Sequence, residues 1–153
     1  MATEYELDEK DLKLIEILAS NARETYTDMA KTLGISDVAV LKRVKKLESK
    51  VIKKYTIVVD PRRVGYKTIS LTGIDVEPEK LFDVIVKLKD HPNVKGLYLA
   101  TGDHPVMAVI WARDEDELAK IHKEVSEVNG VKRVCPSIIL RTLKEIELWF
   151  SVD

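Results

Sequence analysis

The sequence predicts an α+β protein in two parts: an N-terminal helix-turn-helix unit of three helices and a C-terminal ferredoxin-like βαββαβ domain. Apolar residues recur every three or four positions over roughly the first 50 residues, which is the period of an amphipathic helix. After residue 67, runs rich in β-branched residues alternate with helical runs in the order β-α-β-β-α-β. That order folds as an antiparallel sheet with both helices on one face.

The first helix is predicted over Asp8–Ser20. Asp8 is the expected N-cap, because its side chain can accept a hydrogen bond from a free backbone N–H. Glu9 and Asp11 place negative charge in the first turn, where the helix dipole favours it. The buried stripe is expected at Leu12, Ile15, Leu18 and Ala19.

The second helix is predicted to start at Tyr26 with Thr27 as its cap, and Gly34 then supplies a sharp turn. A tight corner between helices often needs a positive φ, which only glycine adopts cheaply. Ser36 is the expected N-cap of a third helix that runs to about Lys50. The inward residues of the second helix are Met29, Ala30 and Leu33, and the apolar stripe of the third is Val40, Val44, Leu47 and Val51.

The outer face of the third helix is basic, because its lysines fall away from the apolar stripe. A small amphipathic helix of this kind, presented by a helix-turn-helix, is suited to the major groove of double-stranded DNA. Lys42 is the best candidate for a hydrogen bond to a guanine edge. The residues expected near base edges are Ser36, Asp37, Val38, Ala39, Leu41 and Lys42, and those expected to hold phosphates are Arg43, Lys45 and Lys46.

A solvated basic face is the alternative for such a helix taken alone. The preceding apolar helix, the glycine turn and the serine cap occur here in the right order, which favours DNA binding. Charge also favours it: residues 22–67 carry twelve positive and five negative side chains, whereas residues 1–21 carry two and six, and residues 68–153 carry eleven and fifteen. A basic segment in an otherwise acidic chain indicates that this segment meets a polyanion.

Residues 51–60 are rich in β-branched side chains and predict a strand that leaves the helical unit. Residues 61–65 predict a turn and linker. Arg62 and Arg63 lie there, either against the DNA backbone or as solvated linker charges; both alternatives stay open.

The second half predicts strands over Thr68–Val76, Val94–Thr101, Val106–Ala112 and Val131–Leu143, with an extra strand over Ile146–Val152. Helices are predicted over Pro78–Asp90, with Leu81, Phe82, Ile85 and Leu88 inward, and over Glu115–Val128, with Leu118, Ile121, His122 and Val125 inward. No helix covers the second face of this sheet, and the continuous apolar run Val106–Ala112 predicts burial on both sides. Homodimerisation through the sheets satisfies both observations.

Catalytic and metal chemistry are not predicted. His91, His104 and His122 are scattered, Cys135 is the single cysteine, and no phosphate-binding glycine loop is present. The longest apolar run is far shorter than the roughly 20 residues that span a bilayer, and the acidic N-terminus is not a secretory signal. We therefore expect a cytoplasmic protein with no membrane association, no metal and no cofactor.

Several motifs together resemble those of the Lrp/AsnC (feast/famine) family of transcriptional regulators. They are residues 8–15 (DEKDLKLI), Ala30-x-x-Leu-Gly-Ile-Ser36, residues 43–48 (RVKKLE), residues 51–55 (VIKxY), Asp60-Pro61, Thr101-Gly-Asp103 and Gly130-Val-x-Arg133. The resemblance covers essentially residues 7–152. It implies a winged-type helix-turn-helix followed by a regulator-of-amino-acid-metabolism (RAM) domain. It also implies dimers that often assemble into tetramers or octamers, with an amino acid bound at the RAM interface in many members.

The chain departs from the family pattern at three places. Lys50 and Lys54 stand where glycine is frequent, and both add positive charge near the DNA-binding face. The family often has Thr-Gly-x-aromatic-Asp in its ligand turn, whereas Pro105 here replaces the final acidic residue that suits an ammonium group. The expected effector-binding residues are Thr101, Gly102, Asp103 and His104. A plain hairpin turn is the alternative for this segment.

We therefore predict a non-enzymatic transcriptional regulator with residues 1–51 as the DNA-binding domain, 52–67 as strand and linker, and 68–153 as the RAM domain. It is expected to bind a pseudo-palindromic operator as a dimer or higher oligomer, with a small effector such as an amino acid. Two alternatives remain open. One is an architectural protein that packs DNA with low specificity, and the other is an enzyme like the siroheme decarboxylases, which resemble the same family.

Overall fold

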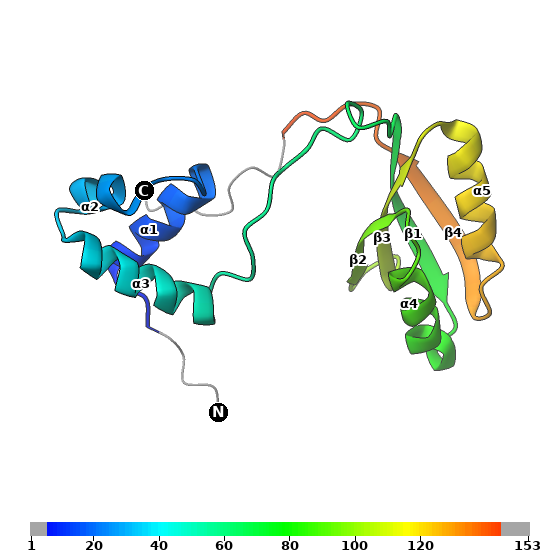
Figure 1. Ribbon diagram of the computed structural model, residues 1–153. Coiled ribbons are helices and arrows are strands. Elements are labelled where there is room, and N and C mark those ends of the chain that lie inside the picture. The colour runs from blue at the N-terminus through cyan, green and yellow to red at the C-terminus, as the bar shows by residue number, and fades with distance from the viewer. Residues whose placement is uncertain (1–5, 145–153) are drawn as a thin grey trace. The chain divides into compact units, whose positions relative to one another are not determined.

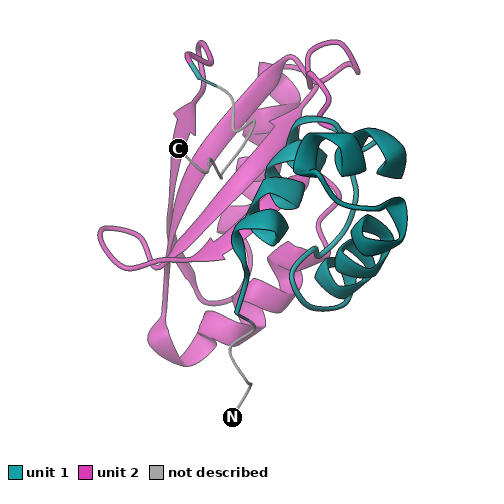
Figure 2. Ribbon diagram, turned by 90° about the vertical axis from the view of Figure 1, so that its left-hand side faces the viewer, with its two compact units in different colours: residues 1–57, 144–153 teal, residues 58–143 magenta. Residues whose placement is uncertain are grey.

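The computed structural model describes residues 6–144, and its contacts divide the chain into two compact units (Figures 1 and 2). One unit ends at Ile57 and the other spans Val58–Leu143. The extra strand predicted over residues 146–152 lies outside the described residues.

The N-terminal unit contains the three predicted helices, α1 (Glu9–Ser20), α2 (Tyr26–Leu33) and α3 (Asp37–Lys50). Asp8 caps α1 in a reciprocal capping box with Asp11. Helix α2 starts at Tyr26 as predicted, but the cap predicted at Thr27 is wrong, because the Thr25 side chain accepts from the Asp28 N–H. Gly34 has the expected positive φ of 63°, and Ser36 caps α3 through the Ala39 N–H.

The core of this unit is formed by one stripe from each helix. Its buried members are Leu14, Leu18, Met29, Ala30, Val40, Val44 and Leu47. The stripe predicted for α1 is partly wrong: Ala19 is exposed and Leu12 only half-buried, while Leu14 is fully buried. Leucine and alanine are both compatible with either side of such a stripe, so the phase of α1 depends on where α2 and α3 pack.

The strand predicted over residues 51–60 is wrong for the single chain. The segment forms no ladder with the described residues of this chain, and Ile57 and Val58 are 82% and 76% exposed. A strand requires hydrogen-bond partners on a neighbouring strand, and β-branched composition alone does not supply them. The wing implied for the helix-turn-helix is therefore absent as a β element from residues 51–60.

The C-terminal unit is a four-stranded antiparallel sheet with strand order β2-β3-β1-β4. Its strands are β1 (Thr68–Val76), β2 (Val94–Leu99), β3 (Val106–Ala112) and β4 (Val131–Ile138). Helices α4 (Leu81–Lys89) and α5 (Glu115–Ser126) lie on the same face of the sheet, as Figure 1 shows. This is the predicted βαββαβ arrangement, with β2 and β4 shorter than expected.

Two details of the α4 segment differ from prediction. Pro78–Lys80 forms a 3₁₀ turn before α4 begins, so the helix is shorter than the predicted 78–90. Phe82 is 75% exposed rather than inward, and Val84 is fully buried in its place. The other three residues predicted inward, Leu81, Ile85 and Leu88, do pack against the core.

The sheet has one covered and one open face. Side chains of β1 and β3 that face the helices are buried in register, for example Ile74 opposite Val106 and Thr72 opposite Ala108. The alternate positions form the open face, which α4 and α5 do not cover. Its members include Ile69, Leu71, Gly73, Asp75, Met107, Val109 and Trp111.

A polar group is buried beneath α5. Ser70 Oγ lies 2.7 Å from Thr72 Oγ1, which lies 3.0 Å from His122 Nε2. Both hydroxyls are fully buried, so these contacts satisfy them. Burial lowers the pKa of His122 below its ordinary value, because the charged imidazolium loses hydration.

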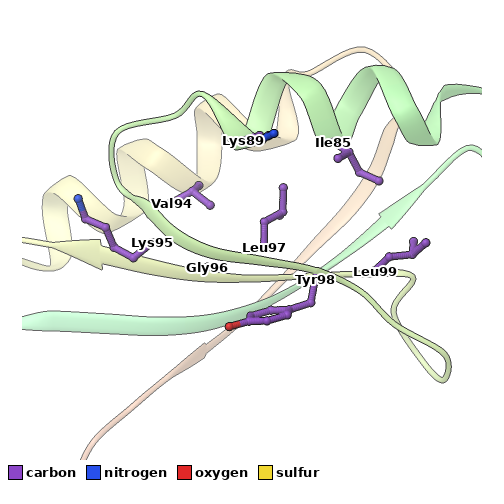
Figure 3. A pocket seen from close by; sticks show the side chains of 8 residues that line it. All are labelled: Ile85, Lys89, Val94, Lys95, Gly96, Leu97, Tyr98 and Leu99. Atoms are coloured by element: carbon purple, nitrogen blue, oxygen red, sulfur yellow. The ribbon is translucent and has the colours of Figure 1, made fainter. Parts of the chain in front are cut away.

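A shallow hollow of about 360 Å³ lies between α4 and the edge strand β2 (Figure 3). Leu97 points from β2 toward α4, whereas Tyr98 points to the opposite side. Ile85 and Lys89 close the hollow from the helix. It shares no residue with the turn at 101–104, so it is separate from the expected effector segment.

Candidate DNA interface and effector turn

The outer face of α3 carries the residues predicted to approach DNA. Val40, Val44 and Leu47 face the core, and the lysines at 42, 45 and 46 are exposed on the opposite side. Val38 is 61% exposed at the start of the helix, whereas Ala39 and Leu41 are half-buried. The face therefore combines cationic side chains with a small apolar surface next to the helix N-terminus.

The start of α3 is held in place by two side-chain contacts. Ser36 Oγ accepts from the Ala39 N–H at 3.2 Å, which makes capping its role within the domain. Thr27 on α2 donates through Oγ1 to the Asp37 carboxylate at 2.7 Å. These contacts fix the two helices of the motif relative to each other, which orients the N-terminal turn of α3.

Arg43 differs from the other cations of α3. Its Nη1 donates to Asp8 Oδ2 at 2.6 Å and to Asp11 Oδ1 at 2.7 Å, so it joins α3 to the first turn of α1. The pKa of Asp8 is lowered, first because its carboxylate accepts a hydrogen bond from the Asp11 backbone N–H and second because it accepts one from Arg43. Any phosphate contact by Arg43 competes with these two carboxylates, so the expected phosphate role is weaker for Arg43 than for Lys45.

The turn between β2 and β3 contains the predicted effector residues. Thr101, Gly102 and Asp103 are exposed, Gly102 has a φ of 116°, and the Ala100 N–H donates to the Pro105 carbonyl at 2.9 Å. His104 leaves the turn and lies over β1. A Cβ added to Gly73 would lie 2.2 Å from the His104 ring, so glycine is what lets the imidazole rest there.

His104 belongs to a cluster that the sequence did not indicate. Its Nδ1 lies 2.7 Å from Asp75 Oδ1, and Arg133 Nε donates to Asp75 Oδ2 at 2.9 Å. The hydrogen bond with His104, followed by that with Arg133, lowers the pKa of Asp75 below its ordinary value. Cys135 lies beside them, and its Sγ, a carboxylate oxygen of Asp75 and a ring nitrogen of His104 lie within 4.8 Å of one another.

The sequence predicts no metal site, whereas the structure brings three potential metal ligands together in space. Asp75, His104 and Cys135 are far apart in the sequence, and spacing rules for metal motifs apply to neighbours along the chain. Strand register brings them together, because Cys135 is opposite Gly73 and Arg133 is opposite Asp75. Only the register between β1 and β4 could have indicated this cluster, and the sequence did not predict that register.

Among residues 6–144, no helix is long and apolar enough to cross a membrane.

The chain matches two family models. Residues 7–48 match the AsnC-type helix-turn-helix domain, and residues 70–148 match the Lrp/AsnC ligand binding domain. The first match covers α1, α2 and most of α3, and the second begins within β1.

Curated relatives are similar along nearly the whole chain. The HTH-type transcriptional regulator LrpA of Pyrococcus horikoshii is 51% identical over 140 residues, which cover 90% of this chain and 99% of that protein. The HTH-type transcriptional regulator Ptr1 of Methanocaldococcus jannaschii is 31% identical and covers 91% of this chain and 95% of its own.

Solved structures share the same fold. AsnC of E. coli has a TM-score of 0.86 at 24% identity and covers 92% of this chain and 97% of its own. The leucine response regulatory protein LrpA of Mycobacterium tuberculosis has a TM-score of 0.79 at 26% identity and covers 91% and 96%.

Proposed function

The chain belongs to the Lrp/AsnC family of transcriptional regulators, with a DNA-binding helix-turn-helix and an effector-binding domain, and we propose that it recognises a pseudo-palindromic operator as a dimer or higher oligomer. The observation that carries the proposal is the exposed N-terminal half of α3, where Val38 and Lys42 face outward beside a capped helix start. A helix held in this way can place its first two turns in the major groove.

Within this face, different residues supply specificity and affinity. Lys42 donates to a guanine edge, and Val38, with Ala39 and Leu41 beside it, packs against thymine methyl groups. Lys45 and Lys46 hold phosphates, which gives affinity that falls as salt rises. Asp37 and Ser36 position the helix start through their contacts with Thr27 and the Ala39 N–H, and so act on base recognition indirectly.

The dimer is proposed to form through the open sheet face. Its apolar side chains Leu71, Met107 and Val109 point away from α4 and α5, and a second copy of this face buries them. Two-fold symmetry then presents two α3 helices, which matches a pseudo-palindromic site. Tetramers or octamers built from such dimers are the proposed higher assemblies.

The effector is proposed to be a small molecule, such as an amino acid, bound at the turn of Thr101, Gly102, Asp103 and His104. The turn exposes one carboxylate at Asp103, and the open backbone at Gly102 allows close approach. The protein is proposed to be cytoplasmic and to have no catalytic activity of its own, in line with relatives that are named as regulators.

In vitro selection from random duplex DNA, performed with the full chain, tests the proposal. Enrichment of a pseudo-palindrome whose half-sites lie about 10 base pairs apart, or a multiple of that, supports it. Absence of an enriched sequence, together with uniform footprinting along any DNA, would instead identify an architectural DNA-packing protein. Repeating the selection with each amino acid present tests the effector.

A further inference from the structure

We propose that Asp75, His104 and Cys135 form a binding site for a divalent transition metal of the Zn²⁺ type. The three residues come from β1, from the turn before β3 and from β4, and all are half-buried on the open side of the sheet. The three residues are far apart in the sequence, so no local motif describes such a site. The proposal is independent of DNA recognition by α3.

The donor set determines which metal fits. A thiolate, an imidazole nitrogen and one carboxylate oxygen suit zinc and its neighbours, whereas Mg²⁺ and Ca²⁺ prefer oxygen ligands alone. Donors in a tetrahedral zinc site lie roughly 3.3–3.8 Å apart, given bonds of about 2.0–2.3 Å. The three donor atoms here lie within 4.8 Å of one another, and Asp75 Oδ1 and His104 Nδ1 are 2.7 Å apart, so side-chain movements of about an ångström give the zinc spacing.

The neighbours of the cluster support its pre-organisation. Arg133 Nε holds Asp75 Oδ2, while Oδ1 is the oxygen that faces His104. Arg133 therefore orients the carboxylate from outside without occupying the donor oxygen, although its positive charge opposes the cation. Its side chain is 66% exposed, so solvent screens that opposition. Such outer contacts position metal ligands in many sites.

Binding requires two changes at the cluster. The Cys135 thiol loses its proton to solvent, because the thiolate is the ligand form. The hydrogen bond between His104 Nδ1 and Asp75 Oδ1 opens, and the ring proton moves through solvent from Nδ1 to Nε2, so that the neutral imidazole coordinates through Nδ1. Three protein ligands leave a fourth position for water or for a small ligand, as in zinc sites that are not purely structural.

Gly73 provides a geometric test, since it is not itself a ligand. A Cβ at this position would lie 2.2 Å from a carbon of the His104 ring, so Gly73→Ala moves the imidazole away from Asp75 and Cys135 while keeping all three donors. A site built on this geometry is weakened by that change. If surface groups elsewhere hold the metal, Gly73→Ala leaves the affinity for the metal unchanged.

The experiment is a titration of the reduced, metal-free full chain with Co²⁺, followed by competition with Zn²⁺. We expect one Co²⁺ per chain, a thiolate-to-cobalt charge-transfer band and the intense visible bands of a tetrahedral site, all removed by Zn²⁺. Cys135→Ser, His104→Gln and Gly73→Ala should each lower affinity at least about tenfold. His91→Gln is the matched control, because His91 pairs with Glu124 elsewhere in the same unit.

Circular dichroism establishes that each variant is folded before its titration is interpreted. Absence of the charge-transfer band in the unaltered chain overturns the proposal. Equal affinity in the unaltered chain and in folded His104→Gln also overturns it, because cobalt then binds Cys135 without the cluster. These outcomes leave operator selection unaffected, so failure of the metal site is distinguishable from failure of the DNA-binding proposal.

Discussion

Arg43 of α3 donates through Nη1 to Asp11 Oδ1 of α1 at 2.7 Å, and the Asp11 side chain is only 5% exposed. The same nitrogen donates to Asp8, the residue that caps α1. The guanidinium thus links the DNA-facing helix to the start of the first helix.

Arg43→Met is expected to destabilise the N-terminal unit by about 1–2 kcal/mol, between the values typical of exposed and buried ion pairs. The loss comes from leaving the nearly buried Asp11 carboxylate without its guanidinium partner. Denaturant unfolding followed by helical circular dichroism measures it. Lys45→Met on the same helix is the matched control and should change stability by less than about 0.5 kcal/mol. Equal effects of the two substitutions would contradict the assigned role.

The contribution of Arg43 to the stability of the folded chain is also expected to depend on pH. The pKa of Asp8 is lowered in the folded chain, so its contribution is present above the unfolded value near 3.8 and is lost as pH falls through the folded value. The difference in melting temperature between the unaltered chain and Arg43→Met should therefore be constant near neutral pH and shrink below about pH 4. A difference that is unchanged in acid would show that Asp8 does not take part.

His122 is expected to make the stability of the chain depend on pH in a second range, which lies closer to neutral pH. Its pKa is lowered by burial, so the folded chain binds a proton less readily than the unfolded chain. Stability is expected to fall as pH drops below about 6.5, the ordinary value for histidine, and to level off below the folded pKa. Thermal unfolding of the unaltered chain between about pH 8 and about pH 5, the range around the ordinary histidine value, measures the slope.

His122→Gln should remove this part of the slope, because glutamine keeps a hydrogen-bonding group near Thr72 but does not titrate. His91→Gln, which alters a hydrogen-bonded contact with Glu124 at 3.3 Å, is the control and should keep the slope that belongs to His122. If the slope persists in His122→Gln, another group is responsible for it.

Leu71→Glu tests the open sheet face as the dimer interface. Leu71 is 40% exposed and lies opposite Val109 in the strand register, at the middle of the apolar surface. A buried carboxylate without a partner would cost several kcal/mol at an interface, so sedimentation should show monomers at concentrations where the unaltered chain is dimeric. Val86→Glu on α4, where the valine is 61% exposed, should leave the dimer intact. Monomers from both variants, or from neither, would place the interface elsewhere.

The caps of α1 and α3, the helix order and the βαββαβ sequence of the second unit were predictable, because each depends on nearest neighbours along the chain. Gly34 and Ser36 are examples, since their backbone geometry is local. The phase of α1 was not predictable, because Leu12 and Leu14 have the same hydrophobicity and only packing separates them. The strand prediction for residues 51–60 was wrong for a similar reason, because strand formation depends on a partner strand as well as on composition.

Among the candidate sites, too, some were predictable from the sequence and others were not. The basic face of α3 follows from helical periodicity and charge, so its residues were identified from the sequence. The contacts of Arg43 with Asp8 and Asp11 join residues more than thirty positions apart, and no pattern in either segment indicates them. The cluster of Asp75, His104 and Cys135 depends on the register between β1 and β4. A shift of one residue in that register would place Cys135 on the opposite face.

Lys42→Ala tests most directly the central claim that α3 recognises DNA sequence. With operator and random duplexes compared by gel shift, the substitution should weaken operator binding by about 1–3 kcal/mol and random binding far less, because it removes a base contact. Lys45→Ala should weaken both to a similar extent and reduce the salt slope by about one, as expected for a phosphate contact. Equal loss on operator and random DNA for Lys42→Ala would contradict the account.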